Sequence, residues 1–224
     1  MEKSIAIFEG ERASNYDNFI QRWIPNYDYV IRILPNLLNV TNPKSILVVG
    51  CGTGNEMLAL ANSKNDWSIT GIDPSPEMIS IAKKKLLSLS NIQLIEARIE
   101  QLPKTEAYNA ATLLLVLHFI PDDGSKLQLL KDIALRIEIN ASLVIIDIFG
   151  SKEDIIKNSH LLTSVLPDSI PKDEMEQRLD RIANQLYHIT EERLSQLLIQ
   201  AGFEATNRFY QMSIYGGWIT KRIK

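Results

Sequence analysis

Cysteine and histidine are scarce in this chain of 224 residues, which contains one cysteine, Cys51, and three histidines. A lone cysteine excludes an internal disulfide framework and a cysteine-rich zinc site. The histidines lie at positions 118, 160 and 188, and neither they nor the scattered carboxylates have the spacing of metal ligands. The sequence therefore predicts no metal site.

The chain also has no long apolar run and no excess of basic residues. Its apolar runs fall well short of the roughly 18 residues that span a bilayer. The opening stretch MEKSIAIFEGERAS is charged and does not resemble a secretory signal. A net charge of −3 gives no indication of a basic nucleic-acid surface. We therefore expect a cytoplasmic protein that does not associate with membranes.

Apolar strands that alternate with helices are what the chain does contain. Five strands are expected within the segments 45–50, 67–73, 92–97, 108–120 and 142–149, with helices at 55–63, 75–89 and 124–138. Strands this apolar are covered on both faces, which is typical of a parallel sheet between two layers of helices. The sequence predicts one α/β domain over 1–224 with its core at 44–150.

Segments of different character flank this core. Residues 16–38 are expected to form helical segments broken at Pro25 and Pro35, within an N-terminal helical cap at 1–40. A charged helical stretch at 151–186 is interpreted as either a lid or a plain surface insertion. A capped helix at 190–203 and two extended segments complete the unit 190–224. The hydrophobic N-terminal region makes a homodimer a reasonable expectation.

A glycine turn follows the first strand, in the stretch ILVVGCGTGNEMLALA. Gly50, Gly52 and Gly54 permit a sharp turn whose backbone amides approach a ligand, and the helix behind them favours an anionic group. A turn without any ligand is the alternative. Asn55 stands where the dinucleotide fingerprint needs glycine, which disfavours NAD.

Asp73 ends the second strand, where an acidic side chain faces the same crevice and can accept both hydroxyls of a ribose. The alternative is an N-cap for the next helix, although Ser75 already offers that function. The glycine turn and Asp73 together are much more specific than either feature alone.

These segments resemble the class I S-adenosylmethionine-dependent methyltransferases. ILVVGCGTGNEMLALA, ITGIDPSPEMISIAKKKL, IQLIEARIEQLP and YNAATLLLVLHFIPDD resemble the four motifs of that family in order and spacing, and FYQMSIYGGWITKR resembles its final hairpin. The resemblance implies a Rossmann-like, doubly wound, seven-stranded sheet, mostly parallel, with an antiparallel last strand. It also implies S-adenosyl-L-methionine as cofactor and S-adenosyl-L-homocysteine as product.

The resemblance assigns cofactor contacts by position. Gly50, Cys51, Gly52 and Gly54 would surround the methionine part of the cofactor, and Asp73 would bind the ribose. The remaining contacts, at the adenine ring and at the methionine ammonium, would come from Pro74, Met78, Ile99 and Leu115.

Two positions depart from the family pattern. The family often has an acidic residue where this chain has Val48, and it usually has Asp or Glu, facing the adenine amino group, where this chain has Arg98. Glu96 or Glu100 is a candidate to compensate. The turn before the fifth strand also differs, since EINAS replaces Pro-Gly-Gly.

A narrower resemblance concerns FIQRWIPNYDYV, which is similar to a stretch in the tRNA wobble-uridine carboxymethyltransferase group. In that group the N-terminal segment closes over the cofactor. Tyr16, Arg22 and Tyr27 are therefore candidates for contacting it, and the alternative is a solvated arginine and two core tyrosines.

His118 lies at the end of the fourth strand and is the candidate general base, with a packed histidine as the alternative. Asp147 ends the fifth strand and is a candidate to orient the acceptor. The predicted activity is methyl transfer to an O, N or C atom of a small molecule. A tRNA-modifying transferase and a catalytically silent cofactor-binding module remain the alternatives.

Overall fold

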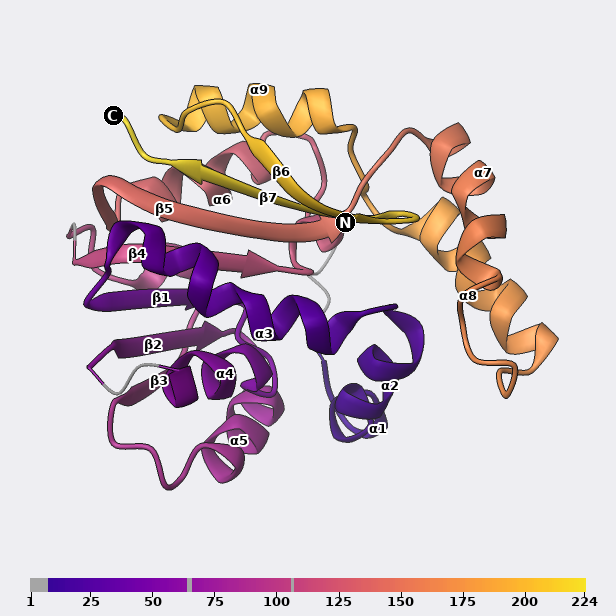
Figure 1. Ribbon diagram of the computed structural model, residues 1–224, viewed down its shortest axis with the longest axis horizontal. Helices are drawn as coiled ribbons and strands as arrows, with labels where there is room; N and C mark the ends of the chain where they lie inside the picture. The colour runs from indigo at the N-terminus through magenta and orange to yellow at the C-terminus, as the bar shows by residue number, and fades with distance from the viewer. Residues whose placement is uncertain (1–7, 64–65, 106) are drawn as a thin grey trace.

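The computed structural model describes residues 8–63, 66–105 and 107–224, and its centre is a seven-stranded sheet in the order β3-β2-β1-β4-β5-β7-β6 (Figure 1). The parallel strands are β1 (Ser45–Val49), β2 (Ser68–Asp73), β3 (Ile92–Glu96), β4 (Tyr108–Leu114) and β5 (Ile137–Ile148). Their arrowheads point to one end of the molecule, at which we place the candidate site.

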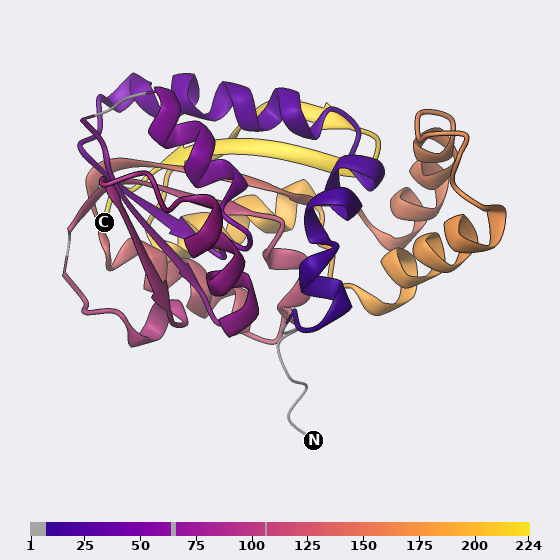
Figure 2. The same cartoon turned by 90° about the horizontal axis from the view of Figure 1, so that it is seen from below.

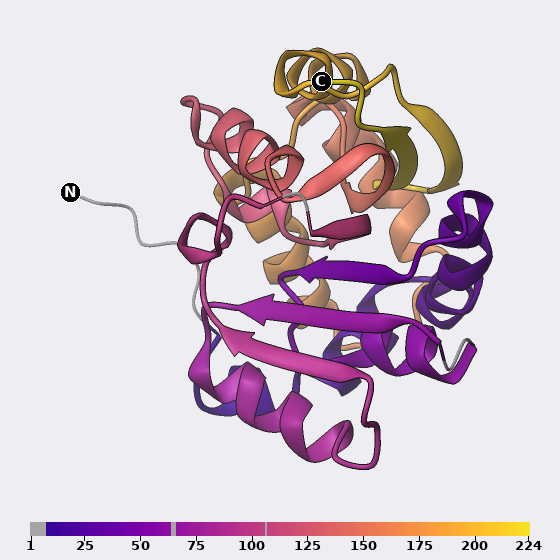
Figure 3. The same cartoon turned by 90° about the vertical axis from the view of Figure 1, so that its left-hand side faces the viewer.

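Helices cover both faces of the sheet, as Figure 3 shows with the sheet seen from its side. In β1 the even-numbered Ile46 and Val48 pack with α3 (Tyr27–Leu38), α4 (Asn55–Ser63) and α5 (Pro76–Lys85). The odd-numbered Leu47 and Val49 pack with α6 (Ser125–Ala134) and α9 (Glu191–Ala201). This alternation follows from the period of two along a strand and explains why β1 is apolar throughout.

The C-terminal hairpin completes the sheet with β6 (Asn207–Met212) and β7 (Tyr215–Lys221). β7 lies antiparallel between β5 and β6, with Ile145 opposite Trp218. The predicted Rossmann-like sheet with an antiparallel last strand is confirmed.

Two local predictions were wrong. Pro35 does not break its helix: α3 continues to Leu38, because Leu34 and Leu38 are fully buried and this packing outweighs the backbone hydrogen bond that proline removes. The fifth strand begins at Ile137 rather than at residue 142. Asn140 adopts a positive φ of 66° there, and the pairing with β4 shifts register, so EINAS is an irregular part of the strand rather than a turn.

The insertion after β5 is helical, as expected, and consists of α7 (Lys152–Thr163) and α8 (Lys172–Gln185). In the N-terminal region, α1 (Glu11–Ser14) and α2 (Tyr16–Trp23) lie between the core and this helix pair (Figure 2). Ile20 and Trp23 of α2 share one apolar cluster with Ile155 of α7 and Ile182 of α8. The N-terminal segment and the insertion therefore pack together at the end of the sheet where the parallel strands terminate.

Three short 3-10 turns connect these elements. They are η1 (Asn39–Thr41), η2 (Ile99–Gln101) and η3 (Leu117–Phe119). η3 follows β4 directly and carries His118 to the carboxyl ends of the strands.

Candidate functional site

The glycine turn between β1 and α4 has a left-handed backbone at all three glycines. φ is +72° at Gly50, +51° at Gly52 and +85° at Gly54, a region that L side chains rarely adopt. A Cβ at Gly50 would lie 2.5 Å from Val116, and one at Gly54 would lie 2.8 Å from Leu86. At Gly52 the nearest atom would be 3.8 Å away, on Tyr16. Gly50 and Gly54 are thus required by packing, whereas a Cβ at Gly52 would make only an ordinary van der Waals contact.

The Asp73 side chain spans the end of β2 and the glycine turn. Its Oδ2 accepts a hydrogen bond from the Gly52 N–H at 2.9 Å, and its Oδ1 accepts one from the Ser75 N–H at 2.9 Å. Burial raises the pKa of this carboxyl, while these two hydrogen bonds act in the opposite direction. Ser75, as expected, is the N-cap of α5, because its hydroxyl accepts from the Met78 N–H. Asp73 is therefore not the N-cap of that helix.

A carboxylate on α2 fastens the N-terminal segment to the glycine turn. Asp17 accepts hydrogen bonds from the Thr53 hydroxyl, from Asn55 Nδ2 at 3.0 Å and from Lys85 Nζ at 2.7 Å. Burial would raise the pKa of Asp17, but the hydrogen bonds from Lys85, Thr53 and Asn55 outweigh it and hold this pKa below its ordinary value. Sequence reasoning missed this anchor, since the partners of Asp17 lie far from it along the chain.

A second contact of the N-terminal segment crosses the crevice. The Ser75 hydroxyl donates to the Phe8 carbonyl at 2.6 Å, and the Phe8 ring packs edge-on against Tyr16 at 5.3 Å. Residues 8–17, which we call the N-terminal strap, therefore extend from the end of β2 to the glycine turn.

A hollow adjoins the glycine turn beneath the strap. It is lined by tyrosines from the N-terminal segment, by the turn itself, and by the ends of α4 and β4: Tyr16, Tyr27, Gly50, Cys51, Gly52, Thr53, Asn55, Glu56, Leu114 and Leu115. Burial raises the pKa values of both tyrosines, so both are neutral at pH 7. Leu115 has a positive φ of 58°, a strained conformation that turns the chain away after β4.

Glu56 is the functional candidate that the sequence reading overlooked. It is buried in the first turn of α4, where its Oε1 accepts a hydrogen bond from the Thr112 hydroxyl of β4. Burial raises its pKa to about 7. Thr112 pairs with Val48 across the sheet, so the Glu56 carboxylate lies against the part of β1 that lacks the acidic residue typical of the family. A glutamate within the otherwise apolar EMLALA stretch was the available signal.

Other predicted residues fall into two groups. Pro74 and Met78 adjoin Asp73 at the end of β2 and the start of α5, and Ile99 is buried in η2. Arg22, in contrast, points to the insertion, where its guanidinium pairs with Glu174 at 3.2 Å. The contact between Arg22 and the cofactor stays a prediction, and in this structure the guanidinium group of Arg22 is engaged with Glu174.

The two candidates to replace the missing acidic residue are both exposed. Glu96 ends β3 and Glu100 lies in η2, and neither side chain is buried as Glu56 is. Half-buried Arg98 donates its backbone N–H to Gln101 Oε1 at 2.6 Å. Compensation by Glu96 or Glu100 for the departures at Val48 and Arg98 stays a prediction, and the carboxylate of Glu56 lies on the Val48 side of the sheet.

His118 and Asp147, predicted separately, form one buried pair. His118 Nδ1 lies 2.7 Å from Asp147 Oδ1, and the other Asp147 oxygen accepts from the Leu117 N–H at 2.8 Å. Lys126 of α6 donates to the carbonyls of Leu117 and Tyr187, and burial lowers its pKa to about 8. These bonds fix the position of the imidazole at the end of β4.

The arrangement fits an adenosyl-sulfonium cofactor. Beside the glycine turn, the carboxylate of Asp73 supplies an acceptor for hydroxyls, and the buried carboxylate of Glu56 supplies a partner for an ammonium group. Among the described residues, no cluster of three or more His, Cys, Asp or Glu side chains could hold a metal ion.

Comparison with known proteins agrees with this geometry. Residues 46–137 match the family of methyltransferase domains. The carboxy-S-adenosyl-L-methionine synthase of Campylobacter concisus is 28% identical over an alignment of 208 positions that covers 88% of this chain and 86% of the relative. The demethylmenaquinone methyltransferase of Bacillus licheniformis is 32% identical over 124 residues, about half of each chain.

Solved structures share the fold at low identity. Human N-acetylserotonin methyltransferase in complex with S-adenosylmethionine superposes with a TM-score of 0.68 at 19% identity, covering 96% of this chain but only 56% of that one. The plantazolicin methyltransferase BpumL with S-adenosylhomocysteine and a substrate analogue gives a TM-score of 0.70 at 16% identity, with 96% and 92% covered. The fold and site define a Rossmann-like cofactor-binding enzyme. Residues 46–137 match a methyltransferase domain, and the chain as a whole is similar to S-adenosylmethionine-dependent enzymes of this fold.

Proposed function

We propose that this chain transfers the methyl group of S-adenosylmethionine to an O, N or C atom of a small molecule. The observation that carries the proposal is the Asp73 carboxylate, held 2.9 Å from the Gly52 N–H at the edge of the glycine turn. A carboxylate in this place can accept both ribose hydroxyls of an adenosyl group.

The other cofactor contacts follow from this placement. Glu56, in the first turn of α4, would form an ion pair with the ammonium group in the methionine part of the cofactor. It would take the place of the acidic residue that β1 lacks at Val48. Leu115, which lines the same hollow, would offer its carbonyl to that ammonium. Gly50, Cys51 and Gly54 shape the turn, and Pro74, Met78 and Ile99 would surround the adenine.

The N-terminal strap would exclude water from the reaction. Tyr16 lies over Gly52, and Asp17 fastens the strap to Thr53, Asn55 and Lys85. Because the sulfonium is already activated by its charge, the main task of the protein is to align the acceptor, an effect of up to roughly 7–11 kcal/mol.

His118 is suited to remove a proton from the acceptor. If the imidazole donates its Nδ1 proton to Asp147, 2.7 Å away, Nε2 carries a lone pair and can accept a proton. Asp147 would then act as a positioning residue that selects the tautomer. This role applies to acceptors whose attacking atom carries a proton, such as a hydroxyl.

A second candidate function comes from the relative in Campylobacter concisus, whose name describes synthesis of a carboxylated S-adenosylmethionine. The similarity extends over 88% of this chain, beyond the cofactor-binding core. The second candidate is therefore a reaction that forms or uses the carboxylated cofactor. Mass spectrometry of the bound nucleoside distinguishes it from simple methyl transfer.

We keep the predicted organisation as a proposal: one domain over 1–224, with a helical cap at 1–40, a core at 44–150, an insertion or lid at 151–186 and a closing unit at 190–224. Residues 1–7 of the cap lie outside the described residues. Within the described residues, no helix has the length and apolar composition needed to cross a bilayer.

We keep a cytoplasmic location and a homodimer as predictions. Within the apolar N-terminal region, Ile20 and Trp23 pack inside the protein, so light scattering is the appropriate test of the dimer.

Calorimetric titration with S-adenosylmethionine, S-adenosylhomocysteine and NAD tests the proposal. We expect both adenosyl-sulfur compounds to bind and NAD not to bind. A chain that binds the cofactor and methylates no member of a broad panel of small molecules would contradict the catalytic part of the proposal. Binding of tRNA that weakens steeply with added salt would favour the tRNA alternative.

A further inference from the structure

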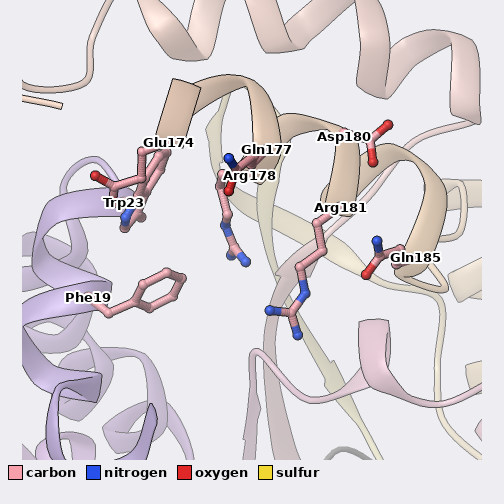
Figure 4. Close-up of a pocket in the computed structure, with 8 residues that line it drawn as sticks. All are labelled: Phe19, Trp23, Glu174, Gln177, Arg178, Asp180, Arg181 and Gln185. Atoms are coloured by element: carbon pink, nitrogen blue, oxygen red, sulfur yellow. The ribbon is translucent and has the colours of Figure 1, made fainter. Parts of the chain in front are cut away.

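A cavity of about 460 Å³ lies between α2 and α8, separate from the glycine turn (Figure 4). Phe19 and Trp23 of α2 form its aromatic wall, with ring centroids 6.3 Å apart. Arg178 and Arg181 of α8 point their guanidinium groups into the space opposite Phe19. The cavity therefore combines aromatic rings with two guanidinium groups, and Glu174 and Asp180 also line it.

Arg12 of the N-terminal strap adds a third positive charge nearby. Its guanidinium carbon lies 3.8 Å from the centroid of the Phe8 ring. Burial lowers the pKa of Arg12, and the charges of Arg181 and Arg178 lower it further, which shows that the three guanidinium groups repel one another. Burial and the charge of Arg181 likewise lower the pKa of Arg178.

The carboxylates beside these arginines are engaged elsewhere. Glu174 pairs with Arg22 at 3.2 Å. Asp180 points away from the cavity and accepts from Asn184 Nδ2 at 2.7 Å. In the described part of the chain, no carboxylate forms an ion pair with Arg12, Arg178 or Arg181.

One donor of this cluster is buried and unsatisfied. Arg178 stacks over Phe19 at 4.7 Å, and its buried Nε has no hydrogen-bond partner among the described residues. A buried donor without a partner costs free energy, and so do like charges that lie close together. Both costs disappear if an anion binds between the guanidinium groups.

The cluster is connected to the candidate methyl-transfer centre by aromatic contacts. The Phe8 ring, on which Arg12 stacks, packs at 5.3 Å on Tyr16 and at 5.6 Å on Phe119, the neighbour of His118. Through Phe8, the arginine cluster therefore adjoins the aromatic side chains beside the candidate methyl-transfer centre.

We propose that the acceptor is a small aromatic or cyclic carboxylic acid, whose carboxylate is held by Arg178 and Arg181 and whose ring packs on Phe19 and Trp23. This inference rests on the proposed function, because it assigns the acceptor of that reaction. A planar guanidinium matches a carboxylate with two parallel hydrogen bonds. The aromatic side chains that line the cavity favour an organic acid with an apolar ring over a free inorganic anion.

Titration of the full chain with benzoate, phenylacetate and indole-3-acetate, alongside their primary amides, tests the inference. The titrations are made with and without S-adenosylhomocysteine. We expect at least one acid to bind, and its amide to bind about tenfold or more weakly, because a charge-assisted hydrogen bond is lost. Phenyl phosphate and tRNA are the comparison ligands.

Arg178→Gln and Arg181→Gln are each expected to weaken binding of the acid about tenfold or more, while S-adenosylhomocysteine affinity changes less than about twofold. Lys172→Gln, which removes the same charge from an exposed position on α8, is the matched control and should leave acid binding unchanged. Thermal unfolding verifies that each variant is folded. Arg181→Gln provides the test if Arg178→Gln does not fold.

The inference is overturned if the acids and their amides bind equally, or if none of the three acids binds. It is also overturned if both arginine variants keep the wild-type affinity for the acid, or if only phenyl phosphate or tRNA binds. Failure of the proposed function gives a different result. In that case S-adenosylhomocysteine does not bind the wild-type chain, while the acid still binds in an arginine-dependent manner.

Discussion

Replacement of Glu56 by glutamine should change how stability depends on pH. The Glu56 carboxyl is fully buried, and its pKa is raised from 4.5 to about 7. Between these values the folded chain keeps a proton that the unfolded chain releases, so the free energy of unfolding falls as pH rises. At about 1.36 kcal/mol per pH unit, the contribution is roughly 3 kcal/mol, present in full below pH 4.5 and lost above about pH 7.

Urea unfolding at pH 5.5, 7 and 8.5, followed by tryptophan fluorescence, measures this effect. Relative to the wild type, Glu56→Gln should gain up to roughly 3 kcal/mol at pH 8.5 and clearly less at pH 5.5. Glu100→Gln, at an exposed position, is the matched control and should follow the wild type at every pH. Parallel pH profiles for the wild type and Glu56→Gln would refute the reasoning.

The folded chain without cofactor favours the protonated form of the Glu56 carboxyl, and cofactor binding should favour its charged form instead. An ammonium group beside Glu56 favours the charged carboxylate, so S-adenosylmethionine should bind more tightly at pH 8 than at pH 6 and should release a proton at the lower pH. Calorimetry in buffers with different ionisation enthalpies counts that proton. Glu56→Gln should bind more weakly and without proton release. Proton release that persists in this variant would assign the effect to another group.

Three other variants test separate parts of the site. Asp17→Ala removes the partner of Thr53, Asn55 and Lys85, so we expect a loss of roughly 1–3 kcal/mol in chemical unfolding and faster proteolysis near the N-terminus; unchanged proteolysis would contradict the anchoring role. His118→Gln should lower kcat by about 10²-fold or more and leave S-adenosylmethionine affinity intact, and an equal loss in both would indicate a structural role. Gly54→Ala should destabilise the chain by at least about 1 kcal/mol in thermal unfolding, because its Cβ meets Leu86 at a φ of +85°; a neutral result would show that the turn adapts.

Local sequence signals predicted the centre of the site well. The glycine turn and Asp73 come together because parallel strands end at the same edge of a sheet, so spacing along the chain fixes their proximity. Such proximity can be predicted because each motif lies in one short segment and because the ends of parallel strands have fixed relative positions. The residues alone indicated five parallel strands, whereas the seven-stranded sheet was implied by the resemblance to the methyltransferases.

Contacts between segments that are far apart along the chain could not be predicted from local sequence patterns. Asp17 meets Thr53, and the strap crosses the crevice, only because α2 packs against both the core and the insertion. The break predicted at Pro35 failed for a related reason: local propensity for a break was overridden by burial of the neighbouring side chains. The buried Glu56 required knowledge of which face of α4 lies against β4.

Titration of the wild-type chain and of Asp73→Ala with S-adenosylhomocysteine tests the central claim most directly. Two ribose hydroxyls that donate to a carboxylate contribute roughly 3–6 kcal/mol, so the variant should bind at least about 10²-fold more weakly than the wild type. A wild-type chain that does not bind the nucleoside, or an Asp73→Ala variant that binds it equally well, would contradict the account.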